Sequence, residues 1–174
     1  RPFDEETVVN YEIGLKSDLT DRIRANVAAF HTEYDDYQAA SFVGLQFLVN
    51  NAEQVNVDGI EVEMTALVTE ELTADVSVTY AHAEYDEYTL LNPATNQLEN
   101  IADVTTVSYV PENTWTAGVQ YDFAPFSFGA LSARVDVTYR DSLVFHPFLN
   151  DLTAADDYTL VNGRISLNDI DLGS

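Results

Sequence analysis

Apolar and polar side chains alternate without a break from Leu131 to Arg140. Leu, Ala, Val, Val and Tyr occupy the odd-numbered positions, and Ser, Arg, Asp, Thr and Arg occupy the even-numbered ones. Successive side chains of a β-strand point to opposite faces, whereas a helix would repeat its apolar positions at three and four residues. The segment therefore predicts a strand with one apolar and one polar face.

The same alternation recurs along the chain and predicts an all-β protein. The other candidate strands are Val9–Lys16, Ile23–Ala29, Ile60–Ala66, Leu72–Tyr80, Trp115–Phe123 and Thr159–Leu167. No segment has the apolar spacing of a convincing helix. Each candidate strand has roughly the 9 to 11 residues that a tilted strand needs to cross a bilayer.

The connections between these strands alternate in length. The short ones are residues 18–21, 69–71 and 124–130, and the long ones are residues 35–55, 84–113 and 141–157. Soluble domains rarely carry loops this long without structure of their own, whereas outer-membrane barrels combine short periplasmic turns with long extracellular loops. We therefore predict an antiparallel up-and-down meander that is part of a transmembrane β-barrel of about seven or more strands.

The composition excludes several classes of function. Thirty acids against seven Lys and Arg give a formal net charge of -23, which argues against nucleic acid as a partner. The absence of Cys excludes disulfides, thiolate metal sites and Cys nucleophiles. The hydrophobic content of 46% is too high for a disordered acidic tail.

The long connections are strongly acidic. Together they hold thirteen Asp and Glu residues and no Lys or Arg. The end of the sheet that they form is therefore expected to be negative. This charge either keeps an exposed rim hydrated or attracts cations and cationic ligands.

In a barrel, the alternation would assign side chains to two environments. The residues expected to face lipid or to form aromatic girdles are Tyr11, Val78, Tyr80, Trp115, Tyr121, Val135 and Tyr139. The residues expected to face the lumen are Asn10, Glu12, Lys16, Arg24, Asn26, Glu61, Glu63, Asp75, Gln120, Arg134, Asp136, Arg140, Asn162 and Arg164. The lumen set carries both signs of charge, and its members are expected to pair largely with one another across strands. The alternative interpretation of the aromatic residues is ordinary packing between neighbouring strands of a sheet.

No set of residues predicts an enzyme. We find no Ser with a base partner and no Gly-rich phosphate loop, so we expect no catalytic, cofactor or metal site. His31 and His82 share the apolar register near the long-connection ends of their strands. A metal site across those strands is one interpretation, and we favour two interfacial polar residues instead. Gly59 follows Asp58 inside an alternating run, which favours a glycine within a strand or a bulge over a hairpin turn.

Several segments resemble, in order, the strands of TonB-dependent outer-membrane receptors. They are Val9–Ser17 with Ala28–Tyr34, Asn51–Glu53 leading to Val57–Glu63, Pro111–Thr114 before Trp115, and Tyr158–Ile165. In that family a barrel of about 22 strands is closed by an N-terminal plug domain. One departure is His31, which stands where a Tyr is usual.

The resemblance implies a transporter in the bacterial outer membrane, with long loops extracellular and short turns periplasmic. Its partners would be outer-membrane lipid, a TonB-type energy-transducing complex and a scarce small solute of the ferric siderophore, haem, cobalamin or oligosaccharide class. Residues 1–174 are expected to be the later part of such a barrel, without the plug domain and the final strands. Seven strands cannot close a pore of that size, so the isolated chain is expected to aggregate or fold poorly.

Two other functions remain open at this point. A passive outer-membrane porin would share the strand pattern but would have no plug domain upstream. A soluble acidic β-sandwich acting as a binding module would pack the apolar face against a second sheet.

Overall fold

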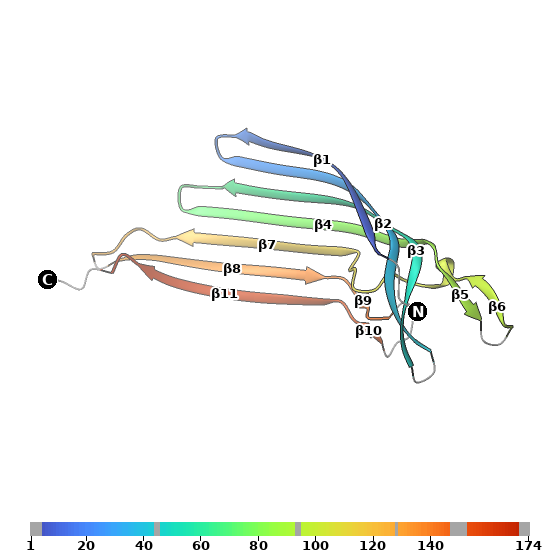
Figure 1. The fold of residues 1–174 in the computed structure, drawn as a ribbon. Coiled ribbons are helices and arrows are strands. Elements are labelled where there is room, and N and C mark those ends of the chain that lie inside the picture. Colours follow the sequence, from blue (N-terminus) through green and yellow to red (C-terminus); the bar gives the residue numbers. More distant parts are fainter. Residues whose placement is uncertain (1–4, 44–45, 93–94, 128, 147–152, 171–174) are drawn as a thin grey trace.

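The computed structural model describes residues 5–43, 46–92, 95–127, 129–146 and 153–170. Its main feature is one antiparallel sheet of seven long strands, which follow one another in chain order (Figure 1). The strands are β1 (Thr7–Thr20), β2 (Ile23–Val43), β3 (Gln46–Leu67), β4 (Leu72–Glu87), β7 (Asn113–Asp122), β8 (Ala130–Arg140) and β11 (Tyr158–Asn168). The predicted all-β meander is confirmed, and each predicted strand lies almost wholly within one of these seven.

The prediction of a loop over residues 35–55 was wrong. β2 and β3 continue through this stretch as a paired hairpin that reaches Val43 and Gln46, well beyond the neighbouring strands (Figure 1). Asp36 interrupts the alternation there, because its φ of 56° takes it out of the ladder between Asp35 and Tyr37. The side-chain amide of Asn51 donates a hydrogen bond to the Asp36 carbonyl and holds this irregularity.

The other long connections carry short elements of their own. The connection after β4 contains the hairpin of β5 (Thr89–Asn92) and β6 (Gln97–Asn100), followed by the 3-10 turn η1 (Ala102–Val104). The connection after β8 contains β9 (Leu143–Val144) and β10 (Ala154–Ala155), which pair with each other. Among the described residues, no helix is long and apolar enough to span a membrane.

The register places apolar side chains in continuous rows across the sheet, because residues paired between strands point to the same face. We call the following five rows the apolar face: Ile13–Ala29–Ile60–Tyr80, Leu15–Val27–Val62–Val78–Trp115–Tyr139, Ser17–Ala25–Met64–Val76–Ala117–Val137–Val161, Ile23–Ala66–Ala74–Val119–Val135–Gly163 and Leu72–Tyr121–Ala133–Ile165. These positions include no Asp, Glu, Lys, Arg or His.

The apolar face is open rather than covered. Val135 is 52% exposed and Val78 is 37% exposed, and Ile13 and Ile165 at the two margins are 78% and 77% exposed. Among the described elements, the two further sheets are two-stranded hairpins of the long connections. The described part of the chain therefore has no second layer of the kind that a soluble sandwich needs.

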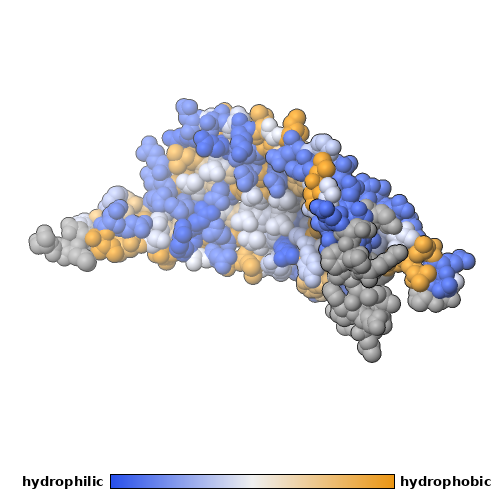
Figure 2. Space-filling view, in the orientation of Figure 1, coloured by the Kyte–Doolittle hydropathy of each residue, from blue (hydrophilic) through white to orange (hydrophobic). Residues whose placement is uncertain are grey.

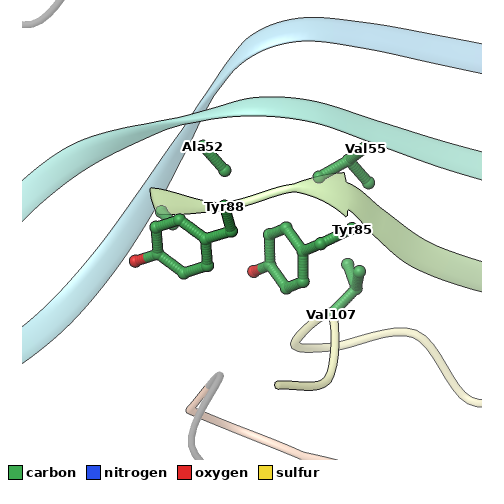
Figure 3. Close-up of a cluster of buried hydrophobic side chains, with 6 residues drawn as sticks. Ala52, Val55, Tyr85, Tyr88 and Val107 are labelled. Atoms are coloured by element: carbon green, nitrogen blue, oxygen red, sulfur yellow. The ribbon is translucent and has the colours of Figure 1, made fainter. Parts of the chain in front are cut away.

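The buried core lies at one end of the sheet. Val55, Tyr85, Tyr88 and Val107 are its largest buried members, and they come together where the long connections meet β3 and β4 (Figure 3). Val55 in β3 and Tyr85 in β4 are separated by an even number of residues from the polar-face side chains of the same strands, so they have the register of the polar face. The cluster therefore covers the long-connection end of the polar face, on the opposite side from the apolar face.

Gly59 is a strand glycine with a packing role. It pairs with Phe30 and Ala81 in an unbroken register, so it is not a bulge. A Cβ at Gly59 would lie 2.6 Å from Cε1 of Phe30 and 2.7 Å from the Tyr80 carbonyl oxygen. The Phe30 ring therefore packs directly over the glycine, as aromatic residues do beside glycines in sheets.

We predict that Gly59→Ala lowers the free energy of unfolding by about 1–3 kcal/mol, because the new methyl overlaps a ring and a backbone oxygen. Gly163→Ala is the matched control, since a Cβ there meets nothing within 4 Å. Denaturant unfolding of the complete barrel protein in detergent measures both variants. Equal stability of the two variants would show that the Phe30 packing is not as described.

Candidate functional site

The candidate functional surface is the polar face, the side of the sheet opposite the apolar rows. The strand pairing places the whole set of residues expected to face the lumen on this one face. Figure 2 shows a side of the molecule on which hydrophilic residues predominate over the sheet. The seven residues expected to face lipid or form girdles all have the register of the apolar face.

An ion cluster joins β4 and β8 across the intervening β7 at the centre of the polar face. Nη1 and Nη2 of Arg134 in β8 donate to the two carboxylate oxygens of Asp75 in β4, at 2.7 and 2.9 Å. Nε of Arg134 donates to Oδ1 of Asp136 at 2.8 Å. The guanidinium spans β7 by lying over Gly118, where any Cβ would collide with it. The two-pronged geometry fixes the guanidinium more firmly than a single contact would.

Other polar residues pair across or along neighbouring strands. Nε of Arg24 donates to Oδ1 of Asp18 at 2.7 Å, in an exposed pair. The side-chain amide of Asn26 donates to Oε2 of Glu63 at 3.1 Å. The predicted pairing of this face is therefore present at several points. In the described part of the chain, the buried Nε of Arg140 has no hydrogen-bond partner.

Aromatic rings pair on the apolar face near both ends of the strands. Trp115 and Tyr139 stack with ring centroids 5.8 Å apart, toward the long connections. Tyr121 and Phe123 meet edge to face at 4.8 Å, beside the short turn before β8. Cross-strand packing and membrane-interface girdles are compatible descriptions of these rings, because a girdle ring also packs against its neighbours.

A tyrosine cluster at the long-connection end was missed by the sequence analysis. Tyr34, Tyr37, Tyr85 and Tyr88 form a chain of rings, with centroids 5.8, 6.2 and 5.0 Å apart in that order. Burial, with the neighbouring Tyr37 and Tyr88, raises the pKa of Tyr85. The sequence did contain a sign of this cluster. Tyr occurs twice at a spacing of three residues, at positions 34 and 37 and again at positions 85 and 88.

His31 in β2 and His82 in β4 lie on either side of Asp58 in β3. Asp58 pairs with His31 on β2 and with His82 on β4. Among the described residues, no group of three or more His, Cys, Asp or Glu has an arrangement that could hold a metal ion. The metal interpretation therefore gains no support from the geometry.

An uncovered apolar face backed by a polar one defines the class of the fold, which is a sheet of the transmembrane β-barrel type. Residues 1–172 match the family model described as TonB dependent receptor-like, beta-barrel. The chain belongs to this family.

Solved structures give the same result for the fold. The ferric yersiniabactin uptake receptor FyuA from Yersinia pestis superposes with a TM-score of 0.70 at 20% identity, over 95% of this chain and 23% of that one. The copper transporter OprC superposes with a TM-score of 0.69 at 12% identity, over 96% of this chain and 23% of that one. The FrpB iron transporter from Neisseria meningitidis gives 0.61 at 18% identity, over 94% and 24%.

The chain thus spans about a quarter of the length of these proteins. The family and its structural neighbours are outer-membrane receptors and transporters, not enzymes. The fold and the membership are therefore established for this chain, and the activity of the whole protein is a separate question.

We predict that Arg134→Ala lowers the free energy of unfolding by about 1–2 kcal/mol, because it leaves the partly buried Asp75 and Asp136 facing each other without a cation. Arg164→Ala is the control, since Arg164 pairs with Arg134 in the register but is exposed. Denaturant unfolding in detergent compares them. A loss of the same size in both variants would contradict a specific role for the cluster.

Proposed function

We propose that this chain is part of the barrel of an outer-membrane receptor that imports a scarce solute of the ferric siderophore class, with energy from a TonB-type complex. The observation that carries the proposal is the apolar face, whose rows contain no ionisable side chain except Tyr and remain open. Such a surface is stable against acyl chains and unstable in water.

The position of the aromatic residues supports a membrane band on this face. Toward the long connections, the boundary residues are Tyr11 in β1, Tyr80 in β4 and Tyr139 in β8. Measured along the register, Tyr80 lies one row and Tyr139 two rows nearer the short turns than Tyr11. Barrel strands are tilted from the membrane normal, so residues at one depth in the membrane shift along the register from strand to strand. The shift from Tyr11 to Tyr80 to Tyr139 is the shift expected of a girdle at constant depth.

The end of the band toward the long connections falls between Ile60 and Asp58 in β3. Ile60 belongs to the last row without a His or carboxylate, and Asp58 is the first ionisable residue beyond it on this face. The long connections then extend past the band on the extracellular side, and the short turns lie on the periplasmic side.

The polar face would line the interior of the complete barrel. The predicted lumen set, with Arg134 and its two carboxylates at the centre, lies on this face. The remaining strands and a plug domain would belong to the longer receptor, which agrees with the 23% of FyuA that the chain covers. The solute class rests on what the neighbouring structures are named for, including uptake of a ferric siderophore.

A growth and uptake experiment tests the transport function. The source strain lacking the parent receptor should lose growth on at least one ferric siderophore as sole iron source, and the receptor gene should restore it. Uptake of that radiolabelled chelate should stop when the TonB-type complex is deleted. Uptake that persists without the complex would indicate a passive porin, and growth unaffected on every siderophore would contradict the proposed solute class.

Arginine substitutions at neighbouring positions of β11 test the membrane-facing assignment. Val161 belongs to the middle row of the apolar face, and Asn162 lies on the polar face. We expect Val161→Arg in the parent receptor to lower the free energy of unfolding in bilayers by about 2–4 kcal/mol, and Asn162→Arg to lower it by under about 1 kcal/mol. Folding into lipid vesicles with urea titration measures both. Equal costs would count against lipid contact.

A further inference from the structure

The first row beyond the apolar face contains an unusual arrangement of histidines and carboxylates. The row runs Tyr11–His31–Asp58–His82 across β1 to β4, and we call it the histidine row. Nδ1 of His31 lies 2.8 Å from Oδ1 of Asp58, and Nε2 of the same ring lies 3.3 Å from Oε1 of Glu33. Both ring nitrogens therefore face a carboxylate oxygen.

His82 repeats this arrangement two strands away. Its Nε2 lies 3.6 Å from Oε2 of Glu84, and its Nδ1 lies 3.6 Å from Oε1 of Glu112. Glu112 also accepts a hydrogen bond from the hydroxyl of Tyr80. Because Glu112 precedes β7, His82 connects the main sheet to the connection that carries Val107 of the buried core.

The geometry of the His31 ring favours one protonation state. A neutral imidazole has one N–H donor and one lone-pair acceptor, so only one of its nitrogens can bond to a carboxylate. The other lone pair would then face a negatively charged oxygen. An imidazolium has two donors and satisfies both contacts with charge-assisted bonds.

The charged groups that contact His31 and His82 are all carboxylates. β1 contributes the ring of Tyr11, stacked on His31 at 6.3 Å. The charged groups are Glu33 from β2, Asp58 from β3, Glu84 from β4 and Glu112 from the connection before β7. In the described part of the chain, each ion pair of these four carboxylates is with His31 or His82, and none is with Lys or Arg.

We propose that the histidine row contains a proton-dependent clasp, in which protonated His31 ties Glu33 of β2 to Asp58 of β3. Loss of the proton removes one of the two charge-assisted bonds and leaves the lone pair of that ring nitrogen facing a carboxylate. The pairing of β2 with β3 around His31 then opens more often. This device is independent of the solute that the receptor carries.

The direction of the pH dependence follows from His31. Its hydrogen bonds to Asp58 and to Glu33 raise the pKa of His31. A raised pKa in the folded state means that the stabilisation is fully present below the unfolded-state pKa, about 6.5, and is lost as the pH rises through the folded-state pKa. The clasp is therefore closed in mildly acidic surroundings and open in alkaline ones.

NMR titration of ¹³C,¹⁵N-histidine-labelled parent receptor in detergent micelles tests the protonation directly. The midpoint of His31 should fall in Asp58→Asn and in Glu33→Gln, and should fall further when both are changed. Glu61→Gln, a carboxylate on the opposite face of β3, is the matched control and should leave it unchanged. A His31 midpoint that is the same in the native protein and in Asp58→Asn would overturn the proposal.

Hydrogen exchange followed by mass spectrometry tests the mechanical consequence. After correction for intrinsic rates, peptides covering residues 29–34 should lose protection between pH 6 and pH 8.5, while residues 74–78 within the apolar face stay protected. The variant His31→Gln should show low protection of residues 29–34 at both pH values. Protection that is independent of pH in the native protein, or unchanged in His31→Gln, would contradict the clasp.

Discussion

An uncharged, uncovered face that runs across seven strands is the constraint on which the rest of this structure depends. In water it would expose rows of Val, Ile, Leu and Tyr side chains that no other described element covers. In a bilayer the same rows contact acyl chains, and a Lys or Arg among them would cost about 2–4 kcal/mol at mid-depth. A bilayer around this face therefore explains why Asp, Glu, Lys, Arg and His are absent from these rows and occur on the opposite face and beyond the strand ends.

The backbone imposes a second requirement in the same medium. Each N–H and C=O group within hydrocarbon must find a partner in the ladder, and β1 and β11 each have one edge without a neighbouring strand in the described sheet. A barrel supplies these partners by closing on itself. We propose that further strands complete the barrel in a longer receptor, which would account for both the open edges and the coverage of about a quarter of FyuA and OprC.

Local alternation predicted what depends on a single strand. Leu131–Arg140 corresponds to β8 (Ala130–Arg140), and the face of each girdle or lumen residue followed from its parity. Contacts between strands could not be predicted from the sequence, because they depend on the register of the strands, and several turns together set that register. Arg134 reaches Asp75 across an intervening strand, and Phe30 covers Gly59 from the polar face. The hairpin extension was hidden because Asp36 breaks the alternation.

The central claim is that alternate residues of each strand contact acyl chains, and nitroxide scanning of β11 tests it most directly. The chain has no native Cys, so single cysteines can be introduced in turn along Tyr158–Asn168 of the parent receptor in bilayers, against a background without Cys elsewhere. Collision rates with oxygen should peak at the odd-numbered positions, and those with a water-soluble nickel chelate at the even-numbered ones. Collision profiles without a two-residue period, or with nickel contact at Val161 and Ile165, would contradict the account.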